Sequence, residues 1–513
     1  MGRVTRTIHS PVLIDANMAQ VVHDRYAHRL DEVFLRQPDG PTLTYRALEA
    51  RASLFVGVLF DAGAVVGDRV VIQVHKSTDA VALYLACLRG GFVFVALNPA
   101  YTVNEVSYFV GDAEPSIIVH APHAPIESVE GVTRAVFSLG VDGTGTLVDA
   151  TATVGPVTTI VPRSSSDLAA MLYTSGTTGR SKGATLSHQN LIVNGFALHD
   201  SWGFSSDDVL LHTLPIFHVH GLFVALHCAM LSACEVIFLP KFDPNAFFAN
   251  LPEATVHMGV PTYYSRLVTD ARLTPATCAH MRLFTSGSAP LSELSFEEFE
   301  ALSGHQMVER YGMTEVGILT SNPLDADRVA GTVGYPLPGV EIRVTNEAGM
   351  SIADGSPGAV ECRGPNVTKG YWRMPDKTAE ATADGNWFRT GDVGTLASDG
   401  RLTLAGRSSD MIISGGLNVY PAEIESCIEE CASVNEIAIV GLPHSDLGEA
   451  VTAFVVAHNA DTVAEDVASA CDGTIARFKH PKQVIVVDEL PRNAMGKVQK
   501  SVLRQSFATL YDR

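Results

Sequence analysis

Segments with strand and helix patterns alternate along the first part of the chain, and this alternation restricts the fold more than any other feature. A helical pattern runs from Thr44 to about Ala62 and is closed by Gly63. An apolar run from Arg69 to Val74, a helical pattern from Asp79 to Leu88 and an apolar run from Phe92 to Leu97 follow in that order. Neighbouring parallel strands need a crossover connection, usually a helix, so the alternation predicts mostly parallel sheets covered by helices.

The same pattern extends well beyond this region. Thr102 and Glu105 form a capping-box sequence that predicts the start of another helix, and the run Ser116 to His120 predicts the strand after it. Further strands are predicted at Val236 to Leu239 and at Met281 to Thr285, with no low-complexity tract or short repeat in the sequence. We therefore expect an α/β fold with one large body.

A change of pattern near residue 410 predicts a second, smaller domain. The stretch Gly406 to Gly416 is polar and glycine-rich, which is typical of a connection. Three strands are predicted beyond it, at Glu436 to Val440, Val451 to Val456 and Gln483 to Val487. A chain of 513 residues is also too long for a single hydrophobic core. We predict a large N-terminal domain over residues 1–406, a connection over 407–410 and a small α+β domain over 411–513.

Composition and charge narrow the classes of partner. The net charge of −20 argues against a nucleic-acid or anionic membrane surface, which would need basic patches, so we expect small-molecule partners. The eight cysteines show no CxxC pair and no zinc-ligand spacing, which favours reduced thiols in the cytoplasm. The N-terminus lacks the apolar core of a signal peptide, but Arg3 and Arg6 precede the first acidic residue, so import into an organelle stays open.

The stretch Gly221 to Pro240 is apolar enough to resemble a membrane span. It contains His227 and Glu235, and it divides into a helix-length piece and a strand-length piece. These features favour a buried core segment over a transmembrane helix.

The ten residues from Thr174 to Gly183, TSGTTGRSKG, are suited to binding phosphate. Glycines at 176, 179 and 183 let backbone N–H groups turn toward an anion, and Lys182 adds a positive charge. Further donors are the hydroxyls of Thr174, Ser175, Thr177, Thr178 and Ser181. The spacing differs from the P-loop GxxxxGK[ST], because glycine follows the lysine. A flexible Ser/Thr/Gly linker is the alternative interpretation.

Two further motifs are suited to a nucleotide. In ERYGMTE, a purine can stack on Tyr311, Thr314 can contact a phosphate and Glu315 can hold Mg²⁺. A turn with a solvated glutamate is the alternative for this motif. In RTGDVG, we expect a tight turn in which the Asp392 carboxylate accepts hydrogen bonds from both ribose hydroxyls, although Gly-Asp turns are common.

Five motifs occur in a fixed order along most of the chain: TSGTTGRSKG, ERYGMTE, RTGDVG, GRSSDMIISGGLNVYPAEIE and PRNAMGK. Together they resemble the adenylate-forming superfamily of acyl-coenzyme A synthetases, luciferases and peptide-synthetase adenylation domains. Within it, four stretches look most like malonyl-coenzyme A synthetases: ALNPAYTVNEVSYFVGDAEP, HTLPIFHVHGLFVA, MGVPTYYSRL and SNPLDADRVAGTVGYPLPGV.

The resemblance implies an acid–thiol ligase that uses ATP, Mg²⁺ and coenzyme A. A carboxylate would attack the α-phosphate of ATP and expel pyrophosphate, and the coenzyme A thiol would then attack the acyl-adenylate and release AMP. Preorganised cations near the α-phosphate stabilise such a transition state. By resemblance Lys497, in the turn Asn493 to Lys497, supplies one, although a lone lysine would otherwise be interpreted as a solvated surface residue.

The resemblance also implies a set of site residues. For ATP and AMP these are Thr174, Ser175, Gly176, Thr177, Thr178, Gly179, Lys182, Gly287, Ser288, Ala289, Glu309, Arg310, Tyr311, Gly312, Met313, Asp392 and Arg407. Thr314 and Glu315 would act in catalysis, with Glu315 as the metal ligand. His218 would contribute to catalysis against the carboxylate pocket, although a histidine among aromatic residues is often a packed core side chain.

By resemblance the small domain rotates between the two half-reactions. The rotation would carry Lys497 away and bring the segment Ser414, Gly415, Gly416 and Leu417 to the coenzyme A thiol, where glycines let the backbone approach closely. The hinge position falls on Ser409, where the family usually has Asp or Lys. This departure concerns the balance of the rotation rather than the adenylation chemistry.

Arg266, in MGVPTYYSRLV, is the predicted selectivity residue. By resemblance it faces the acyl pocket, where its guanidinium can pair with the distal carboxylate of malonate, and Ser286 can add a second donor. Methylmalonate would fit if the pocket had room for one methyl group. An outward-facing helix arginine in a surface salt bridge is the alternative. The apolar stretch Val316 to Leu319 instead favours a monocarboxylate, so a ligase for short- or medium-chain fatty acids is the alternative substrate class.

Three other functions remain open at this stage. An adenylation enzyme could load a separate carrier protein rather than coenzyme A. A non-catalytic nucleotide sensor would be expected to lack Lys497 or Glu315, and both are present. A luciferase-like oxidase shares the fold, because a fold does not determine the chemistry it hosts.

Overall fold

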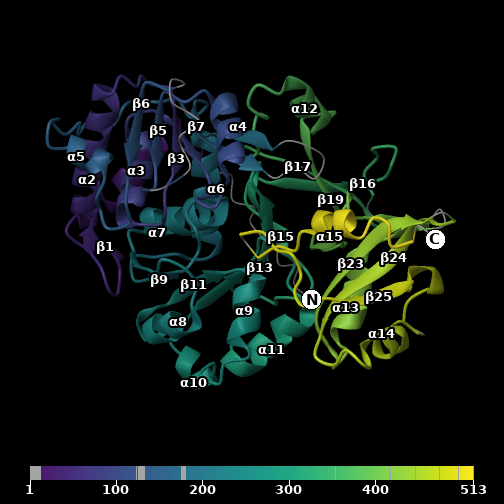
Figure 1. The fold of residues 1–513 in the computed structure, drawn as a ribbon. Helices are drawn as coiled ribbons and strands as arrows, with labels where there is room; N and C mark the ends of the chain where they lie inside the picture. Colours follow the sequence, from purple (N-terminus) through teal and green to yellow (C-terminus); the bar gives the residue numbers. More distant parts are fainter. Residues whose placement is uncertain are drawn as a thin grey trace.

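The structure of the protein, a computed structural model, describes residues 13–122, 124, 133–174, 181–352, 354–414, 417–444, 446–472, 474–494 and 496–511. Within these residues the strands form four sheets. Three belong to a large N-terminal domain and one to a small C-terminal domain, which lies at one side of the large domain (Figure 1). The predicted α/β fold of a large and a small domain is confirmed.

The largest sheet has nine strands and a parallel centre. In spatial order they are β15 (Tyr335–Pro336), β14 (Gly317–Ser321), β13 (Val308–Met313), β12 (Leu283–Ser286), β11 (Val256–Gly259), β9 (Val209–His212), β10 (Glu235–Phe238), β1 (Val33–Arg36) and β2 (Thr42–Thr44). The pairs from β13 to β1 are parallel, whereas β15, β14 and β2 join antiparallel at the two edges. Parallel strands all end at one edge, which is where ligands bind in α/β folds.

A second sheet of the large domain is also mainly parallel. Its six strands are β6 (Ala135–Ser138), β5 (Ile117–His120), β3 (Arg69–Gln73), β4 (Val93–Ala96), β7 (Leu168–Thr174) and β8 (Lys182–Ser187). Only β8 runs antiparallel to its neighbour in this sheet. The two sheets confirm the parallel arrangement that the alternating pattern predicts.

The third sheet was not predicted and is antiparallel throughout. It contains β16 (Glu341–Thr345), β17 (Gly358–Arg363), β18 (Thr382–Ala383), β19 (Trp387–Leu396) and β20 (Leu402–Arg407). The sheet of the small domain contains β21 (Ile412–Ser414), β22 (Leu417–Val419), β23 (Val434–His444), β24 (Gly448–Ala457) and β25 (Gln483–Val486). Sheet membership therefore changes between Arg407 and Ile412.

Helices cover the sheets of both domains (Figure 1). In the large domain they are α1 (Met18–Tyr26), α2 (Tyr45–Asp61), α3 (Thr78–Arg89), α4 (Val103–Ala113), α5 (Thr146–Ala150), α6 (His188–Ser201), a π-helix (His220–Leu226), α7 (His227–Ser232), α8 (Pro244–Asn250), α9 (Pro261–Leu267), α10 (Pro275–Cys278), α11 (Glu293–Ser303) and α12 (Pro375–Glu380). In the small domain they are α13 (Pro421–Glu429), α14 (Val463–Cys471) and α15 (Lys500–Ser506). Short 3₁₀ turns occur at Ala27–Arg29, Leu251–Glu253 and Arg477–Lys479.

Local signals explain where several helices begin. The Thr44 side chain caps α2 by accepting from the Ala47 backbone, and Thr102 forms with Glu105 the capping box predicted for α4. Each cap satisfies backbone N–H groups that would otherwise lack a partner at the helix start. The predicted starts of these two helices are confirmed.

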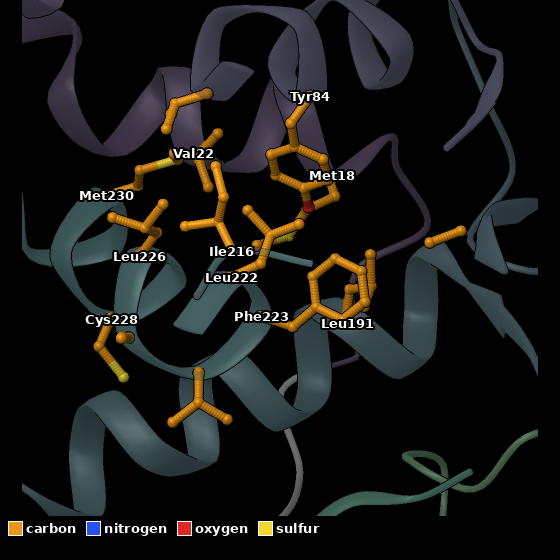
Figure 2. Close-up of a cluster of buried hydrophobic side chains, with 14 of the residues drawn as sticks. Met18, Val22, Tyr84, Leu191, Ile216, Leu222, Phe223, Leu226, Cys228 and Met230 are labelled. Carbon is orange, nitrogen blue, oxygen red and sulfur yellow. The ribbon is translucent and has the colours of Figure 1, made fainter. Parts of the chain in front are cut away.

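The apolar stretch Gly221 to Pro240 lies in the core of the large domain. It forms most of the π-helix, all of α7 and the strand β10, as the predicted division into helix and strand pieces requires. Figure 2 shows its side chains Leu222, Phe223, Leu226, Cys228 and Met230 packed with Met18, Val22, Tyr84, Leu191 and Ile216. Among the described residues, no helix has both the length and the apolar composition needed to cross a bilayer.

Candidate functional site

The phosphate-loop motif connects two antiparallel strands. Thr174 ends β7 and lies opposite Lys182, the first residue of β8. Thr174 Oγ1 donates to Lys182 O at 3.4 Å, and Lys182 Nζ lies 4.5 Å from the centre of the Tyr371 ring. The predicted phosphate donors Ser175, Gly176, Thr177, Thr178 and Gly179 lie outside the described residues.

Glu315 lies in the turn between β13 and β14, close to the base of this loop. Its side chain is 4% exposed, and its Oε1 accepts a hydrogen bond of 3.0 Å from the Tyr371 hydroxyl. Burial raises the pKa of Glu315, while the positive charges of Arg407 and Lys182 act in the opposite direction. Tyr371 thus connects the predicted metal ligand to Lys182 of the phosphate loop. Thr314, the preceding residue, is half-buried.

This carboxylate fits a magnesium ion that arrives with a nucleotide. Mg²⁺ keeps several water ligands and usually binds proteins through one or two carboxylates together with substrate phosphates. In the described part of the chain, no group of three or more His, Cys, Asp or Glu side chains could enclose a metal ion. The single buried carboxylate of Glu315, linked through Tyr371 to Lys182, is compatible with the first arrangement.

Asp392 lies in the middle of β19, not in the tight turn that the RTGDVG motif predicted. It lies directly opposite Arg407, the last residue of β20, and Arg407 Nε is 2.8 Å from Asp392 Oδ1. The Tyr311 hydroxyl donates to the other carboxylate oxygen. Neighbours on both sides therefore fix the Asp392 carboxylate. Tyr311 is itself only 8% exposed, and stacking of a purine on its ring stays a prediction.

Lys497 lies in a closed turn of the small domain. The Asn493 N–H donates to Lys497 O at 2.9 Å, and the Lys497 N–H donates to Asn493 Oδ1 at 3.0 Å. Burial and the nearby charge of Arg407 lower the pKa of Lys497, whereas Asp392 and Asp410 raise it. The structure therefore brings Lys497 close to Asp392 and Arg407, residues predicted to hold the ribose.

A second group of predicted residues meets at the end of β12. Ser286 ends the strand, Gly287 follows, and Ser288 has a left-handed backbone with φ of 73°. Arg310 of β13 packs its guanidinium against Gly287, where a Cβ atom would lie 2.5 Å from Arg310 Cζ. Ser288 Oγ lies 3.2 Å from His220 Nδ1. A side chain at position 287 would overlap the Arg310 guanidinium, so the observed packing of Arg310 requires glycine there.

This group contains buried donors that lack partners. Arg310 is 3% exposed, Ser286 is completely buried and His220 is 3% exposed. Arg310 Nε and Nη2, Ser286 Oγ and His220 Nε2 make no hydrogen bond within the described residues. An unpaired buried polar group is unfavourable by about 1–3 kcal/mol, and a charged one by more. Such a cluster is expected where a ligand supplies the missing acceptors.

Arg266 was predicted to bind the carboxylate and Arg310 the nucleotide, and the two arginines differ in burial. Arg266, the predicted selectivity residue, lies on α9 with an exposed side chain, whereas Arg310 on β13 is buried. His218 is half-buried, and burial lowers its pKa to about 4. His220 was missed in the sequence, although it stands two residues after His218 in the same HVHG motif.

The predicted coenzyme A segment lies on a hairpin of the small domain. Ser414 is 4% exposed and pairs with Gly448 of β24 and with Leu417, which is 48% exposed. Gly415 and Gly416 lie outside the described residues. These contacts of Ser414 are within the small domain, in contrast to Lys497, which reaches the large domain.

The predicted hinge lies between two anchored residues. The N–H and the hydroxyl of Ser408 both donate to Gly391 O at 2.9 Å, which attaches Ser408 to β19 of the large domain. Asp410 Oδ1 accepts a hydrogen bond of 2.7 Å from Arg504 of α15 in the small domain. Ser409 lies between them and is exposed. Ser409 therefore lies between a residue bonded to the large domain and a residue whose side chain is bonded to the small domain.

Comparisons with known proteins agree with these motifs. Residues 22–372 match the family model described as AMP-binding enzyme, and residues 423–497 match the AMP-binding enzyme C-terminal domain. The mitochondrial malonate–CoA ligase of Mus musculus is 34% identical over 495 residues, which cover 87% of this chain and 83% of the mouse protein. The indoleacetate–CoA ligase of Aromatoleum aromaticum is also 34% identical, over 487 residues that cover 91% and 93% of the two chains.

Solved structures extend the comparison to the whole fold. The ATP-bound crystal structure of MatB from Rhodopseudomonas palustris has a TM-score of 0.94 with 48% identity, and it covers 97% of this chain and 100% of its own. The apo structure of the same protein has a TM-score of 0.83 with the same identity and coverage. The resemblance seen in the sequence motifs is thus confirmed, and the chain belongs to the AMP-binding enzyme family, within the adenylate-forming superfamily.

Proposed function

We propose that the protein is an ATP-dependent acid–thiol ligase that converts malonate into its coenzyme A thioester. In the first step a carboxylate oxygen of malonate bonds to the α-phosphorus of ATP, and the bond to the bridging β-phosphate oxygen breaks to release pyrophosphate. In the second step the sulfur of coenzyme A attacks the acyl carbonyl and AMP leaves. Mg²⁺ bound with ATP neutralises charge on the phosphates.

The charges around the nucleotide support the adenylation step. The charges of Lys497 and Arg407 lie close enough to interact, and in the proposed site these two cations would reduce the repulsion between the carboxylate anion and a phosphate. Asp392 is held by Arg407 and Tyr311, and in the proposed site its carboxylate would accept hydrogen bonds from the ribose hydroxyls. Superposition is also closer on the ATP-bound than on the apo relative, with TM-scores of 0.94 and 0.83, which supports an adenylation arrangement of the domains.

The observation that carries the choice of malonate is the buried Arg310 with its unpaired donors. A guanidinium can hold a carboxylate through two parallel hydrogen bonds, and Ser286 and His220 offer further donors beside it. A monocarboxylate would leave this charge unpaired, whereas the second carboxylate of malonate would satisfy it. Methylmalonate carries the same second carboxylate and is the expected alternative substrate.

The fatty-acid alternative depended on the apolar stretch Val316 to Leu319. Val316, Ile318 and Leu319 are all buried in the main hydrophobic cluster, which explains their apolar character without an alkyl-binding wall. Overall identity does not decide between substrates, because the malonate and indoleacetate ligases are equally similar to this chain. We therefore base the choice of malonate on the buried charge of Arg310, rather than on the apolar stretch or on overall sequence identity.

The remaining assignments belong to the same proposal. We assign the coenzyme A side to the segment Ser414 to Leu417 and the pivot to Ser409, with domains at 1–406 and 411–513; the change of attachments from Ser408 to Asp410 supports this division. The eight free cysteines suit a reducing compartment, which we take to be the cytoplasm.

The test makes the same substitution, arginine to methionine, at two positions. AMP release would be measured with ATP, Mg²⁺ and coenzyme A across malonate, methylmalonate, butyrate and octanoate. Arg310→Met should lower kcat/KM for malonate by about 100-fold, the loss typical of a buried charge pair, with butyrate turnover unchanged or higher. Arg266→Met is the matched control on the exposed arginine and should change the malonate kcat/KM by less than about fivefold, as rim charges do.

The Tm of the Arg310→Met variant distinguishes a substrate-binding role of Arg310 from a structural role. Removing a buried charge without a partner should raise the Tm of the free protein, whereas removing a structural arginine should lower it. A wild-type preference for butyrate or octanoate would contradict the malonate proposal and leave the ligase chemistry intact. Turnover only with a carrier protein, and none with free coenzyme A, would contradict the thioester proposal.

A further inference from the structure

A lysine outside the nucleotide site joins the two parallel sheets of the large domain. Lys76 follows β3 of the six-stranded sheet, and its Nζ lies 2.7 Å from Nδ1 and 3.0 Å from the backbone oxygen of His212. His212 ends β9 of the nine-stranded sheet. The ammonium group also lies 4.3 Å from the centre of the Phe238 ring, at the end of β10. One side chain thus connects the carboxyl ends of strands from both sheets.

His212 extends this connection to the next segment of the chain. Its Nε2 lies 2.8 Å from Gly221 O, and because a carbonyl oxygen can only accept, Nε2 carries the proton. Nδ1 is therefore the acceptor for the Lys76 amine. Gly221 is confined on its other side, where a Cβ atom would overlap the backbone oxygen of Pro215. The hydrogen bond from His212 holds the backbone at Gly221 in this narrow space.

The segment held in this way carries a residue of the carboxylate pocket. His220 directly precedes Gly221, begins the π-helix and places Nδ1 3.2 Å from Ser288 Oγ. π-helical turns occur often at functional sites, where they re-aim a side chain. A shift of the peptide between residues 220 and 221 would therefore move the His220 imidazole relative to Ser288 and Arg310.

We propose that Lys76 is a positioning residue for carboxylate binding, acting through His212 and Gly221 to hold His220 in the pocket. The inference rests on the proposed ligase function and adds a residue outside the proposed nucleotide and carboxylate sites. Burial lowers the pKa of the Lys76 amine well below its ordinary value, so its placement is unfavourable unless the contacts to His212 and Phe238 offset the loss of water.

The test begins with Lys76→Met, which keeps the length of the side chain and removes its donors. We expect the KM for malonate to rise about tenfold, the effect of one hydrogen bond of ordinary net strength, while kcat and the KM for ATP change less than about twofold. The matched control is Tyr84→Phe. It removes the 2.7 Å hydrogen bond from Tyr84 to His227 Nε2, which joins α3 to α7 in the same core but beyond the π-helix.

The control should lower the Tm about as much as Lys76→Met and leave the KM for malonate unchanged. An equal KM increase in both variants, or an unchanged KM in Lys76→Met, would overturn the proposal. The wild-type protein is assayed first with several carboxylates. If it prefers a carboxylate other than malonate, that result contradicts the malonate assignment and not the role of Lys76. The KM comparison is then made with that carboxylate.

Variants of His212 test the same link if Lys76→Met does not fold. The glutamine amide offers a donor nitrogen and an acceptor oxygen, so His212→Gln should retain most of the malonate affinity, whereas His212→Leu should show about the tenfold increase in KM. The double variant Lys76→Met/His212→Leu should be no worse than His212→Leu, because both changes remove one connection. Additive increases in KM would show that the two residues act separately and would refute the inference.

Discussion

A substitution at Gly496 can weaken the observed contact between the two domains without changing any charged group. It lies in the Lys497 turn with φ of 73°, and a Cβ atom there would lie 2.6 Å from Oγ1 and 3.0 Å from Cγ2 of Thr262 on α9. Gly496→Ala therefore has two separable effects. One is strain within the small domain, and the other is overlap with the large domain.

The two effects have different consequences for the reaction. A left-handed backbone at alanine is unfavourable by about 1–2 kcal/mol, and this strain is present in every arrangement of the domains. Overlap with Thr262 is unfavourable by about 1–3 kcal/mol, as for other overpacked contacts, and it exists only in the arrangement seen here. The second effect should reduce the population of this arrangement by roughly 5- to 150-fold, since 1.4 kcal/mol is a factor of ten.

The assay follows each half-reaction separately. Malonate-dependent exchange of pyrophosphate into ATP reports adenylation, and formation of the thioester from a synthetic acyl-adenylate reports the second step. Gly496→Ala should slow the first by the factor above and leave the second within about twofold. Thr262→Ala removes both clashing atoms, so it should be near wild type alone and should restore most of the exchange rate in the double variant. A double variant as slow as Gly496→Ala alone would place the effect in the turn itself and refute the interface argument.

Two further predictions concern Lys497 and Glu309. Lys497→Ala should abolish pyrophosphate exchange and spare the reaction of preformed acyl-adenylate with coenzyme A, and equal loss in both steps would contradict its assigned role. Burial raises the pKa of Glu309 from about 4.5 to about 8, so between these values the native state keeps a proton that the unfolded chain has lost. Stability should therefore fall as pH rises from 5 to 8, by about 1.4 kcal/mol for each pH unit, and Glu309→Gln should flatten this slope in thermal unfolding at pH 5.5, 6.5 and 7.5. An unchanged slope would show that Glu309 is ionised in the folded protein.

Features that depend on a few neighbouring residues could be predicted from the sequence. The starts of α2 and α4 follow from Thr44 and from the Thr102–Glu105 pair, because a cap acts within one helical turn. The alternation of strand and helix patterns likewise predicts the parallel sheets, since each crossover helix connects consecutive strands. Local chemistry thus determines both the element and its neighbour along the chain.

Features that depend on distant pairing could not be predicted in the same way. Gly391 and Gly394 made RTGDVG look like a turn, but β19 is a strand because β17 and β20 pair with it on both sides. The burial of Arg310 and the exposure of Arg266 were likewise not predictable from their local sequences. Arg310 is buried because Gly287, on the neighbouring strand connection, leaves space for its guanidinium, and no local pattern reports such space.

The proposed nucleotide site and the connection between the two domains lie on one continuous stretch of backbone that begins with β20. Arg407 ends the strand beside Asp392, Ser408 is tied to the large domain, and Asp410 is tied to the small one. A ligand that binds Arg407 more tightly in one arrangement of the two domains must favour that arrangement. By thermodynamic reciprocity, that arrangement raises the affinity for the ligand by the same factor. Enzymes whose domains are locked together by a crosslink should therefore retain ATP more tightly.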